Sequence, residues 1–372
     1  MSNYTVRPPV RPPQTRNQPR RRRAPQNRMP ARRSPARAGS FDMRWLTIGM
    51  IAAPIFLIGV LGMIALIGVV MASPNGIGFV PTPIPPSPTP YVPPYAISLR
   101  LYDPVRDETI TWDVPPATWG QWIAIPITEP PLPGTALPLD AAQVEAYLNG
   151  RQAELGADRY INLQEGVAAA VNAAAGSDYT PVRLYHRERQ HTVQPGESII
   201  SIAWDYGIPY PYVQEVNPGV EALSVGQSIT IPSPDVLLPL PVVSGKRIEV
   251  SISEQRARVY ENGALKWDWV VSTGIDSSPT WTGVYQILSH EPNAYASNWN
   301  LWMPNFLGVY RPVPYADFTN GFHGFPTRGG SQLLWTNSLG TRVTYGCILL
   351  SNDNIALLYD WAQDGVVVEI TG

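Results

Sequence analysis

The feature that most constrains this chain is an uncharged, apolar stretch of 28 residues at positions 45–72, WLTIGMIAAPIFLIGVLGMIALIGVVMA. About 20 apolar residues cross the hydrocarbon core of a bilayer, so this stretch is long enough to span it with some tilt. A buried helix of this length without a polar face would be unusual in a soluble protein, and the apolar part of a cleaved signal peptide is shorter. The stretch therefore predicts a single transmembrane helix.

Positive charge is concentrated before this stretch. Residues 1–44 contain 12 arginines and one acid, Asp42, although the whole chain has a formal net charge of only −2. Many prolines and no apolar periodicity predict a disordered tail, and the positive-inside rule predicts a cytoplasmic one. Everything after the stretch is then expected outside the cell, as the extracytoplasmic part of a single-pass protein of the cell membrane. Because the basic residues lie in one tail, we expect no nucleic-acid partner.

Two segments follow the apolar stretch. Residues 73–96 hold nine prolines in 24 positions, which favours an extended, semi-rigid spacer. Residues 97–188 predict a small α/β module, in which two alternating strands precede two helices and a further strand. Asp140 is placed to cap the first helix, and Gly156 follows its end. The order of these elements loosely resembles peptidoglycan-binding modules, and a packing or spacer domain is the alternative.

A more specific pattern lies at residues 189–233. It contains TVQPGES, SIAWDYGI, VNP and LSVGQSITIP, in that order. This pattern resembles the LysM module, and the resemblance implies a βααβ fold that binds glycan strands containing N-acetylglucosamine, as in peptidoglycan. The groove of that family implies contacts from Gly196, Glu197, Ser198 and Asn217. Turns need the same residue types, so a purely structural role for these four residues stays open.

The C-terminal segment carries the only cysteine, Cys347, and one of four histidines, His323, lies 24 residues before it. A single cysteine excludes an intrachain disulfide and any cysteine-cluster metal site, and we expect no metal and no cofactor. An unpaired thiol is most often a small buried side chain. Outside the cell it is an oxidation liability, and a histidine in the same domain can supply the base that a thiol nucleophile needs. The residues alone leave both interpretations open.

Residues 246–372 predict mostly strands. Asn262 and Gly263 between two alternating runs are a strong hairpin signal. A long aromatic-rich loop is expected between positions 290 and 320, and one helix over SNDNIALLYDWAQDG. Aromatic side chains more often belong to a core, but some could line a substrate cleft. The candidates are His290, Trp281, Trp299, Trp302 and Trp335.

The pieces VVSTG, SPTWTGVY, FHG, SLGTRV and YGCI follow one another in this segment. They resemble the catalytic domain of YkuD-type L,D-transpeptidases, and the resemblance implies a mainly β fold. It also implies that Cys347 is the nucleophile and that His323 is the general acid and base. The carbonyl of Gly324 would orient the imidazole, and the backbone at Gly346 would contribute to the oxyanion hole.

The sequence departs from this family pattern in three places. Tyr345 stands where the family has histidine, and Leu349 stands where arginine or asparagine is usual. The spacing of 24 residues between histidine and cysteine exceeds the family's usual mid-teens. Nucleophile and base are retained, so we expect the chemistry to remain and recognition of the donor substrate to change. Tyr345 is a candidate substrate contact, or it simply packs.

Together these segments predict a multidomain, membrane-anchored peptidoglycan L,D-transpeptidase that forms 3→3 cross-links through a cysteine thioester. Its expected partners are peptidoglycan stem peptides, glycan strands and the cytoplasmic membrane. Two alternatives stay open. One is an L,D-carboxypeptidase or wall hydrolase with the same cysteine and histidine, and the other is an inactive tether that binds peptidoglycan. The oligomeric state does not follow from the sequence.

Overall fold

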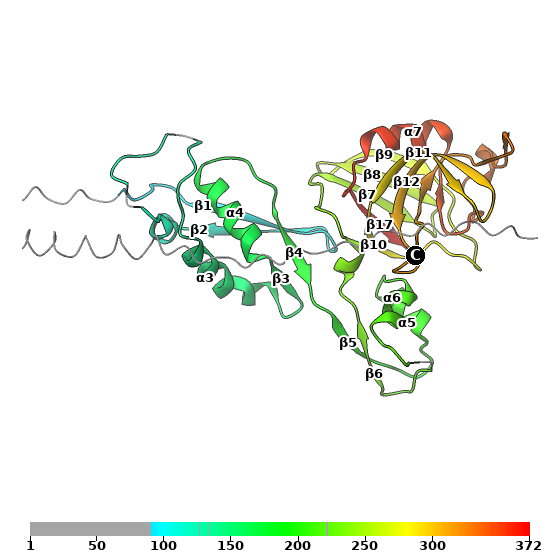
Figure 1. The fold of residues 1–372 in the computed structure, drawn as a ribbon, viewed down its shortest axis with the longest axis horizontal. Coiled ribbons are helices and arrows are strands. Elements are labelled where there is room, and N and C mark those ends of the chain that lie inside the picture. The colour runs from blue at the N-terminus through cyan, green and yellow to red at the C-terminus, as the bar shows by residue number, and fades with distance from the viewer. Residues whose placement is uncertain (1–90, 126, 133, 221) are drawn as a thin grey trace, which may run out of the picture. The chain divides into compact units, whose positions relative to one another are not determined.

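A computed structural model describes residues 91–372, apart from residues 126, 133 and 221 (Figure 1). The predicted tail, the predicted membrane helix and most of the proline-rich spacer lie outside these residues. Among the helices of the described part of the chain, none combines the length and the apolar character that a membrane span requires. In chain order, the described residues form an α/β module, a two-helix module and a larger β domain.

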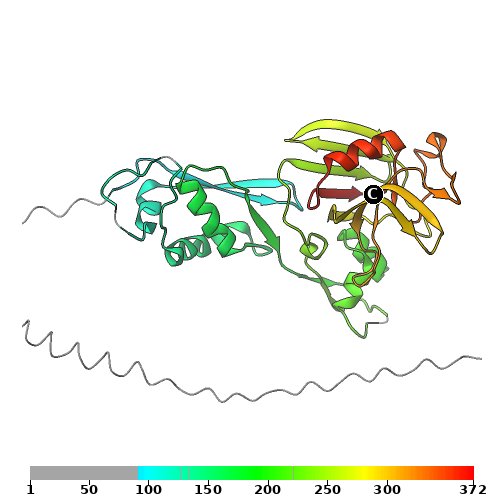
Figure 2. The ribbon, with the colours of Figure 1, turned by 45° about the horizontal axis from the view of Figure 1, so that its top comes forward.

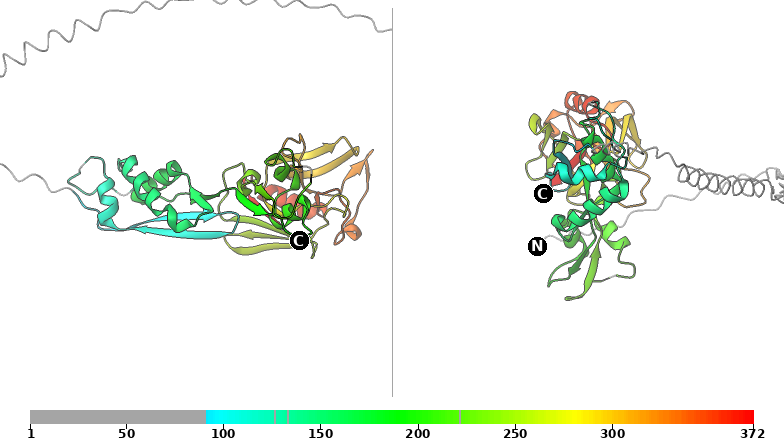
Figure 3. Two further views of the ribbon diagram at one scale, coloured as in Figure 1. Left: turned by 90° about the horizontal axis from the view of Figure 1, so that it is seen from below. Right: turned by 90° about the vertical axis from the view of Figure 1, so that its left-hand side faces the viewer.

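The α/β module is a four-stranded sheet with helices packed on it. The strand order is β2-β1-β4-β3, in which β1 and β4 run parallel and the two outer pairs run antiparallel. The elements are β1 (Ile97–Asp103), β2 (Glu108–Val114), α2 (Pro116–Trp119), α3 (Ala141–Arg151), β3 (Arg159–Ile161), α4 (Leu163–Ala174) and β4 (Val182–His186). Helices α3 and α4 contact each other on one side of the sheet (Figure 3).

Local sequence signals account for the two longer helices of this module. The carboxylate of Asp140 accepts hydrogen bonds from the backbone N–H groups of Ala142 and Gln143, which confirms the predicted N-cap. Asn162 caps α4 in the same way. Apolar side chains of the sheet and the helices form a core of their own, which includes Leu99, Leu101, Trp112, Trp119, Val144 and Leu148.

The two-helix module has the predicted βααβ order. Its elements are β5 (Arg189–Thr192), α5 (Ile199–Asp205), α6 (Tyr210–Glu215) and β6 (Ser228–Ile231). The two strands pair antiparallel. Ser198 and Ser201 form a capping box at the start of α5, and Ile202 and Ala203 are buried on one face of that helix.

Two sheets form the β domain. One has the strand order β10-β17-β7-β8-β9, and the other has the order β15-β14-β12-β13-β16, with β11 also paired to β12. The elements are β7 (Lys246–Ser251), β8 (Arg256–Glu261), β9 (Ala264–Val270), β10 (Gly283–Gln286), β11 (Ser289–Ala296), β12 (Leu301–Tyr310), β13 (Asn320–His323), β14 (Thr327–Arg328), β15 (Ser331–Gln332), β16 (Ile348–Leu349), α7 (Asn352–Trp361) and β17 (Val367–Thr371). Helix α7 packs against β12 and β13 of the second sheet (Figure 2).

The prediction of an aromatic-rich loop is wrong for most of this segment, because β11 and β12 form a long antiparallel hairpin there. Pro292 hides the pattern, since proline within a run argues against a strand. In the structure the pairing skips Pro292 and resumes at Asn293, while Asn305 on the facing strand has a φ of 49°. β11 pairs only with β12, so proline is tolerated on this edge strand. The hairpin turn carries Trp299.

The two-helix module and the β domain share one apolar core. The rings of Trp204 in α5 and Tyr210 in α6 each lie 5.6 Å, between centroids, from the ring of Trp281 in the β domain. Two glycines let the backbones meet at this contact. A Cβ atom on Gly283 would lie 2.2 Å from the carbonyl oxygen of Gly207, closer than any side chain allows.

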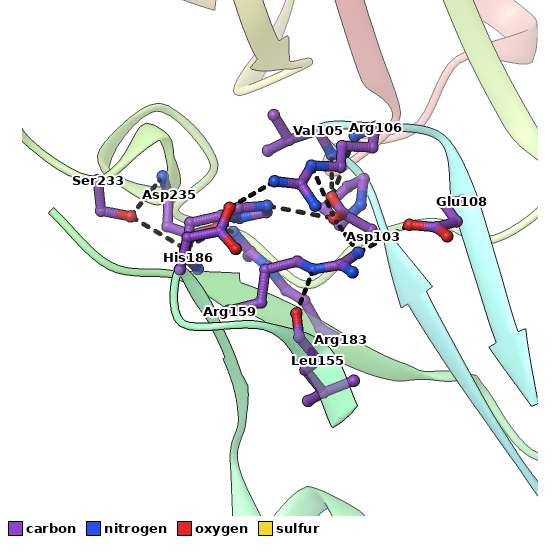
Figure 4. A network of polar contacts seen from close by, with 12 residues as sticks. Asp103, Val105, Arg106, Glu108, Leu155, Arg159, Arg183, His186, Ser233 and Asp235 are labelled. Carbon is purple, nitrogen blue, oxygen red and sulfur yellow. Dashed lines mark hydrogen bonds and ion pairs between the residues drawn. The ribbon is translucent and has the colours of Figure 1, made fainter. Parts of the chain in front are cut away.

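A buried polar network joins the α/β module to the 3₁₀ turn Pro234–Leu237 (Figure 4). In it, His186 Nε2 lies 3.2 Å from Asp103 Oδ2, and His186 Nδ1 lies 3.6 Å from Asp235 Oδ2. Burial opposes a charge on His186, but hydrogen bonds and charge from the two aspartates outweigh it and raise the pKa of His186 to about 9. The imidazolium therefore ties segments that are distant in sequence.

Candidate active site

Neighbouring strands place Cys347 and His323 together. β13 and β16 pair in parallel, and the register sets His323 opposite Leu349. Cys347 comes directly before β16, next to this pairing. Both side chains line one cavity of about 730 Å³. The structure thus brings together the two residues that the sequence singles out for chemistry.

The imidazole of His323 is buried and held in one orientation. Its Nδ1 lies 2.7 Å from the carbonyl oxygen of Gly324, the contact that the family resemblance implies. A carbonyl only accepts, so Nδ1 carries the proton and Nε2 keeps a free lone pair. Burial lowers the pKa of His323 to about 4, against the opposing effect of the Gly324 hydrogen bond. At neutral pH the ring is a neutral base.

The thiol of Cys347 is also neutral at rest. Burial raises the pKa of Cys347 to about 11, although a backbone hydrogen bond at Gly321 acts in the opposite direction. Sγ donates to Oδ1 of Asn320 across 3.6 Å. The two pKa shifts disfavour a thiolate–imidazolium pair in the resting site. A thiol that lines the same cavity as a free imidazole is an arrangement suited to general-base catalysis, in which the proton leaves as the sulfur attacks.

Two side-chain hydroxyl groups fix the peptide between Gly346 and Cys347 through its carbonyl oxygen. The carbonyl oxygen of Gly346 accepts from Thr280 Oγ1 and from Tyr310 Oη, each at 3.0 Å. In a trans peptide the following N–H points the opposite way, so the Cys347 N–H is directed away from these buried donors. Gly346 has a φ of 107°, and a Cβ there would lie 2.6 Å from Asn320 Nδ2. This peptide therefore has the fixed geometry that an oxyanion donor requires.

An aromatic pair covers one side of the cavity. Tyr345 is 54% exposed, and its ring stacks on that of Trp299 with centroids 5.8 Å apart and planes 15° apart. Both residues line the cavity. Tyr345 therefore packs on Trp299 in the wall of the cavity, and its exposed part is accessible to a ligand.

The other aromatic candidates do not line this cavity. Trp281 packs against Trp204 and Tyr210. The ring of His290 is engaged elsewhere, with Nδ1 2.7 Å from Asp364 Oδ1 and Nε2 2.9 Å from the Ala362 carbonyl. Trp302 and Trp335 are exposed outside it.

Two departures from the family pattern have a structural explanation. Leu349 is fully buried and forms an isolated bridge with Ser272, so its position offers packing and no polar group to a substrate. The long spacing between His323 and Cys347 accommodates the small hairpin of β14 and β15 and a 3₁₀ turn at Thr336–Ser338. These additions leave the pairing of β13 with β16 intact.

The predicted glycan-binding residues of the two-helix module have structural roles. Glu197 accepts from His191 Nε2 and from the Gln194 N–H. The amide of Asn217 bonds backbone groups of Val213 and Thr230. Ser198 caps α5, and Gly196 supplies a φ of 85° at the preceding turn. Their contact with glycan stays a prediction, and they lie apart from the cysteine cavity.

Sequence reasoning missed three residues around the thiol: Asn320, Tyr310 and Thr280. All three bond to the Gly346–Cys347 segment or to one another. Asn320 and Tyr310 lie in none of the sequence motifs. Thr280 lies in the SPTWTGVY piece, but its contact with the Gly346 carbonyl depends on the fold. Across residues 91–372, with the three gaps stated above, no cluster of three or more histidine, cysteine, aspartate or glutamate side chains could hold a metal ion.

Two segments of the chain match known protein families. Residues 245–370 match the model of the YkuD family, described as an L,D-transpeptidase catalytic domain, and residues 191–232 match that of the LysM domain. A relative in Bacillus licheniformis, named "Putative L,D-transpeptidase YkuD", is 28% identical over 183 residues. The match covers 49% of this chain and 98% of the relative.

Two solved structures are also similar to part of the chain. An L,D-transpeptidase from Mycobacterium smegmatis is 20% identical, with 40% of this chain and 65% of that chain covered and a TM-score of 0.30. The L,D-transpeptidase of Stackebrandtia nassauensis is 22% identical, with 36% and 58% covered and a TM-score of 0.28. This chain thus spans less than two thirds of either of these proteins.

Fold and family match together define the class of the β domain, which is a mainly β, L,D-transpeptidase-like domain. The chain as a whole carries a YkuD-type L,D-transpeptidase catalytic domain that is preceded by a LysM domain.

Proposed function

We propose that this chain is a peptidoglycan L,D-transpeptidase that forms 3→3 cross-links through a thioester on Cys347. The observation that carries the proposal is the meeting of Cys347 and a neutral His323 at one cavity, with Nδ1 of His323 held by the Gly324 carbonyl. The YkuD and LysM matches support peptidoglycan as the substrate.

The acylation half-reaction follows from these positions. Nε2 of His323 takes the thiol proton as Sγ of Cys347 attacks the carbonyl of the third residue of a stem tetrapeptide, diaminopimelate or lysine. The tetrahedral oxyanion is stabilised by the Cys347 N–H, which the anchored Gly346 carbonyl orients. His323 then returns the proton to the departing D-alanine amine, and the acyl group stays on sulfur as a thioester.

The second half-reaction decides between the candidate activities. When an amine of another stem attacks the thioester, His323 takes the amine proton. It then passes this proton to the departing sulfur of Cys347, so the thiol is restored and a 3→3 cross-link is formed. Attack by water would produce a tripeptide and make the enzyme an L,D-carboxypeptidase. An inactive tether would form no thioester at all.

Intact-mass analysis of the compact unit of residues 86–372 with a stem tetrapeptide tests this proposal. A thioester adduct together with cross-linked dimer is the expected result. Adduct with tripeptide alone would identify a hydrolase, and no adduct would identify a tether. Both of these outcomes contradict the transpeptidase proposal.

We also propose that residues 45–72 anchor the chain in the cytoplasmic membrane with its folded domains outside. The arginine-rich tail and the uncharged stretch support this topology. Protease added to intact cells should remove the LysM and catalytic domains and leave a tag at the N-terminus intact. Protection of the C-terminal domains would contradict the topology.

The LysM domain is proposed to hold glycan strands of the cell wall. Val225, 66% exposed, lies in the loop that precedes β6, where an apolar contact with a sugar ring is available. Val225→Lys should reduce co-sedimentation of residues 86–372 with purified peptidoglycan by several fold. Val236→Lys, at a 47% exposed valine of the 3₁₀ turn, is the matched control. An equal effect of both substitutions would contradict the assignment.

A further inference from the structure

The side-chain amide of Asn320 connects the thiol of Cys347 to the hydroxyl of Tyr310. Its Oδ1 accepts from Cys347 Sγ at 3.6 Å, and its Nδ2 donates to Tyr310 Oη at 3.3 Å. Nδ2 also lies 2.6 Å from the point where a Cβ of residue 346 would stand, so only glycine fits there. Asn320 begins β13, the strand that ends in His323. One strand thus contributes both a base and an amide to the thiol.

Hydrogen bonds on Tyr310 fix which end of the amide faces the sulfur. The Tyr310 hydroxyl donates to the carbonyl oxygen of Gly346 at 3.0 Å, and the backbone N–H of Trp281 donates to Tyr310 Oη at 3.2 Å. The direction of both hydrogen bonds is fixed, because a carbonyl only accepts and an N–H only donates. The proton of Tyr310 is therefore used, and Oη can only accept from Asn320. The amide must turn its nitrogen to Tyr310 and its oxygen to Cys347.

We propose that Asn320 is a positioning residue of the active site, oriented by Tyr310, that holds the Cys347 thiol with its proton directed to Oδ1. This inference rests on the proposed role of Cys347 as nucleophile. A carbonyl acceptor beside the sulfur stabilises S–H over the thiolate. When substrate binds, the thiol hydrogen turns from Oδ1 to Nε2 of His323, and the proton passes to Nε2 as the sulfur–carbon bond forms. Asn320 exchanges no proton in this step.

Two substitutions should move the reactivity of the thiol in opposite directions. Asn320→Asp places a carboxylate beside Sγ, which disfavours the thiolate, so alkylation by iodoacetamide at pH 8 should slow about tenfold or more. Tyr310→Phe removes the hydroxyl that fixes the amide, and Nδ2 can then turn towards the sulfur. A donor favours the thiolate, so alkylation at pH 8 should quicken about threefold or more.

The experiment follows the alkylation rate of residues 86–372 from pH 6 to 11 by intact mass, with thermal unfolding of every variant as a check on folding. Cys347 is the only cysteine in the sequence, so no other thiol contributes to the signal. Tyr285→Phe is the matched control. Tyr285 is fully buried and stacks on Tyr310 with centroids 4.8 Å apart, but its hydroxyl donates to the Thr282 carbonyl, outside this network. Its alkylation profile should match the wild type.

Opposite shifts for Asn320→Asp and Tyr310→Phe, with an unchanged Tyr285→Phe profile, support the inference. Shifts in one direction for all three variants, or no shift in folded Asn320→Asp, overturn it, because a purely packing role loosens the site in each case. The readout needs no stem peptide. Opposite shifts in a protein that forms no thioester would therefore contradict the proposed function alone. Normal cross-linking without the shifts would contradict only the role of Asn320.

Discussion

Cys347→Ala and His323→Ala should each reduce formation of 3→3 cross-links by at least about 10³-fold, and the double variant should be scarcely worse than either single one. Sγ and Nε2 act as one unit, because the neutral thiol of Cys347 has no nucleophilic strength until the imidazole accepts its proton. Cross-linked dimer from tetrapeptide, measured by liquid chromatography, checks the result. Wild-type cross-linking by Cys347→Ala would show that the cysteine is only a buried side chain.

The same pair sets a pH profile. Acylation of Cys347 by a carbapenem, whose strained carbonyl resembles the scissile amide, should be nearly constant between pH 6 and pH 9. The pKa of His323 is lowered to about 4, so the ring stays a neutral base above about pH 5. The pKa of the thiol is raised to about 11, so the thiol keeps its proton below about pH 10. A fall that began at pH 7 on acidification would instead indicate loss of a thiolate–imidazolium pair.

Gly346→Ala should lower the rate of carbapenem acylation by about 10²–10³-fold. The added Cβ would meet Asn320 Nδ2 at 2.6 Å, so either the amide or the Gly346–Cys347 peptide must move. Movement of that peptide misdirects the N–H that faces the oxyanion. An alanine is also strained at the φ of 107° that Gly346 adopts, and this strain by itself costs stability.

A matched glycine separates these two effects. Gly340 has a φ of 84°, and its added Cβ would meet only Val270 Cγ1, at 3.5 Å. Gly340→Ala should therefore lose about 1 kcal/mol of stability and keep its acylation rate. Acylation rates and thermal unfolding of both variants check the prediction. Equal losses of acylation in the two variants would show that backbone strain, and not the contact with Asn320, causes the defect.

Local signals in the sequence predicted much of the fold. Asp140 caps its helix through two backbone N–H groups, as its position at the start of a helical stretch indicates. Asn262 and Gly263 adopt the positive φ angles, 53° and 77°, that a two-residue hairpin turn requires. Such features depend on a few neighbouring residues, and so they can be read without knowledge of the tertiary structure.

The candidate site was predictable only in part. Cys347 and His323 carry the chemistry in their side chains, and the sequence identified them through residue type and motif. Asn320 and Tyr310 act through contacts that depend on the parallel register of β13 and β16 and on the β12–β13 pairing. The hairpin of β11 and β12 was missed because Pro292 breaks its alternation, and the position of Trp299 was lost with it.

The protonated state of the Cys347 thiol has a consequence for the lifetime of the protein. Oxidants attack thiolates far faster than thiols, and a cysteine sulfenic acid is rescued most readily by a second cysteine that forms a disulfide. This sequence has one cysteine, so no partner within it can intercept the damage before it becomes irreversible. With a pKa of about 11, only about one thiol in 10⁴ is ionised at pH 7. The low thiolate fraction at neutral pH therefore slows attack by peroxide on the resting site.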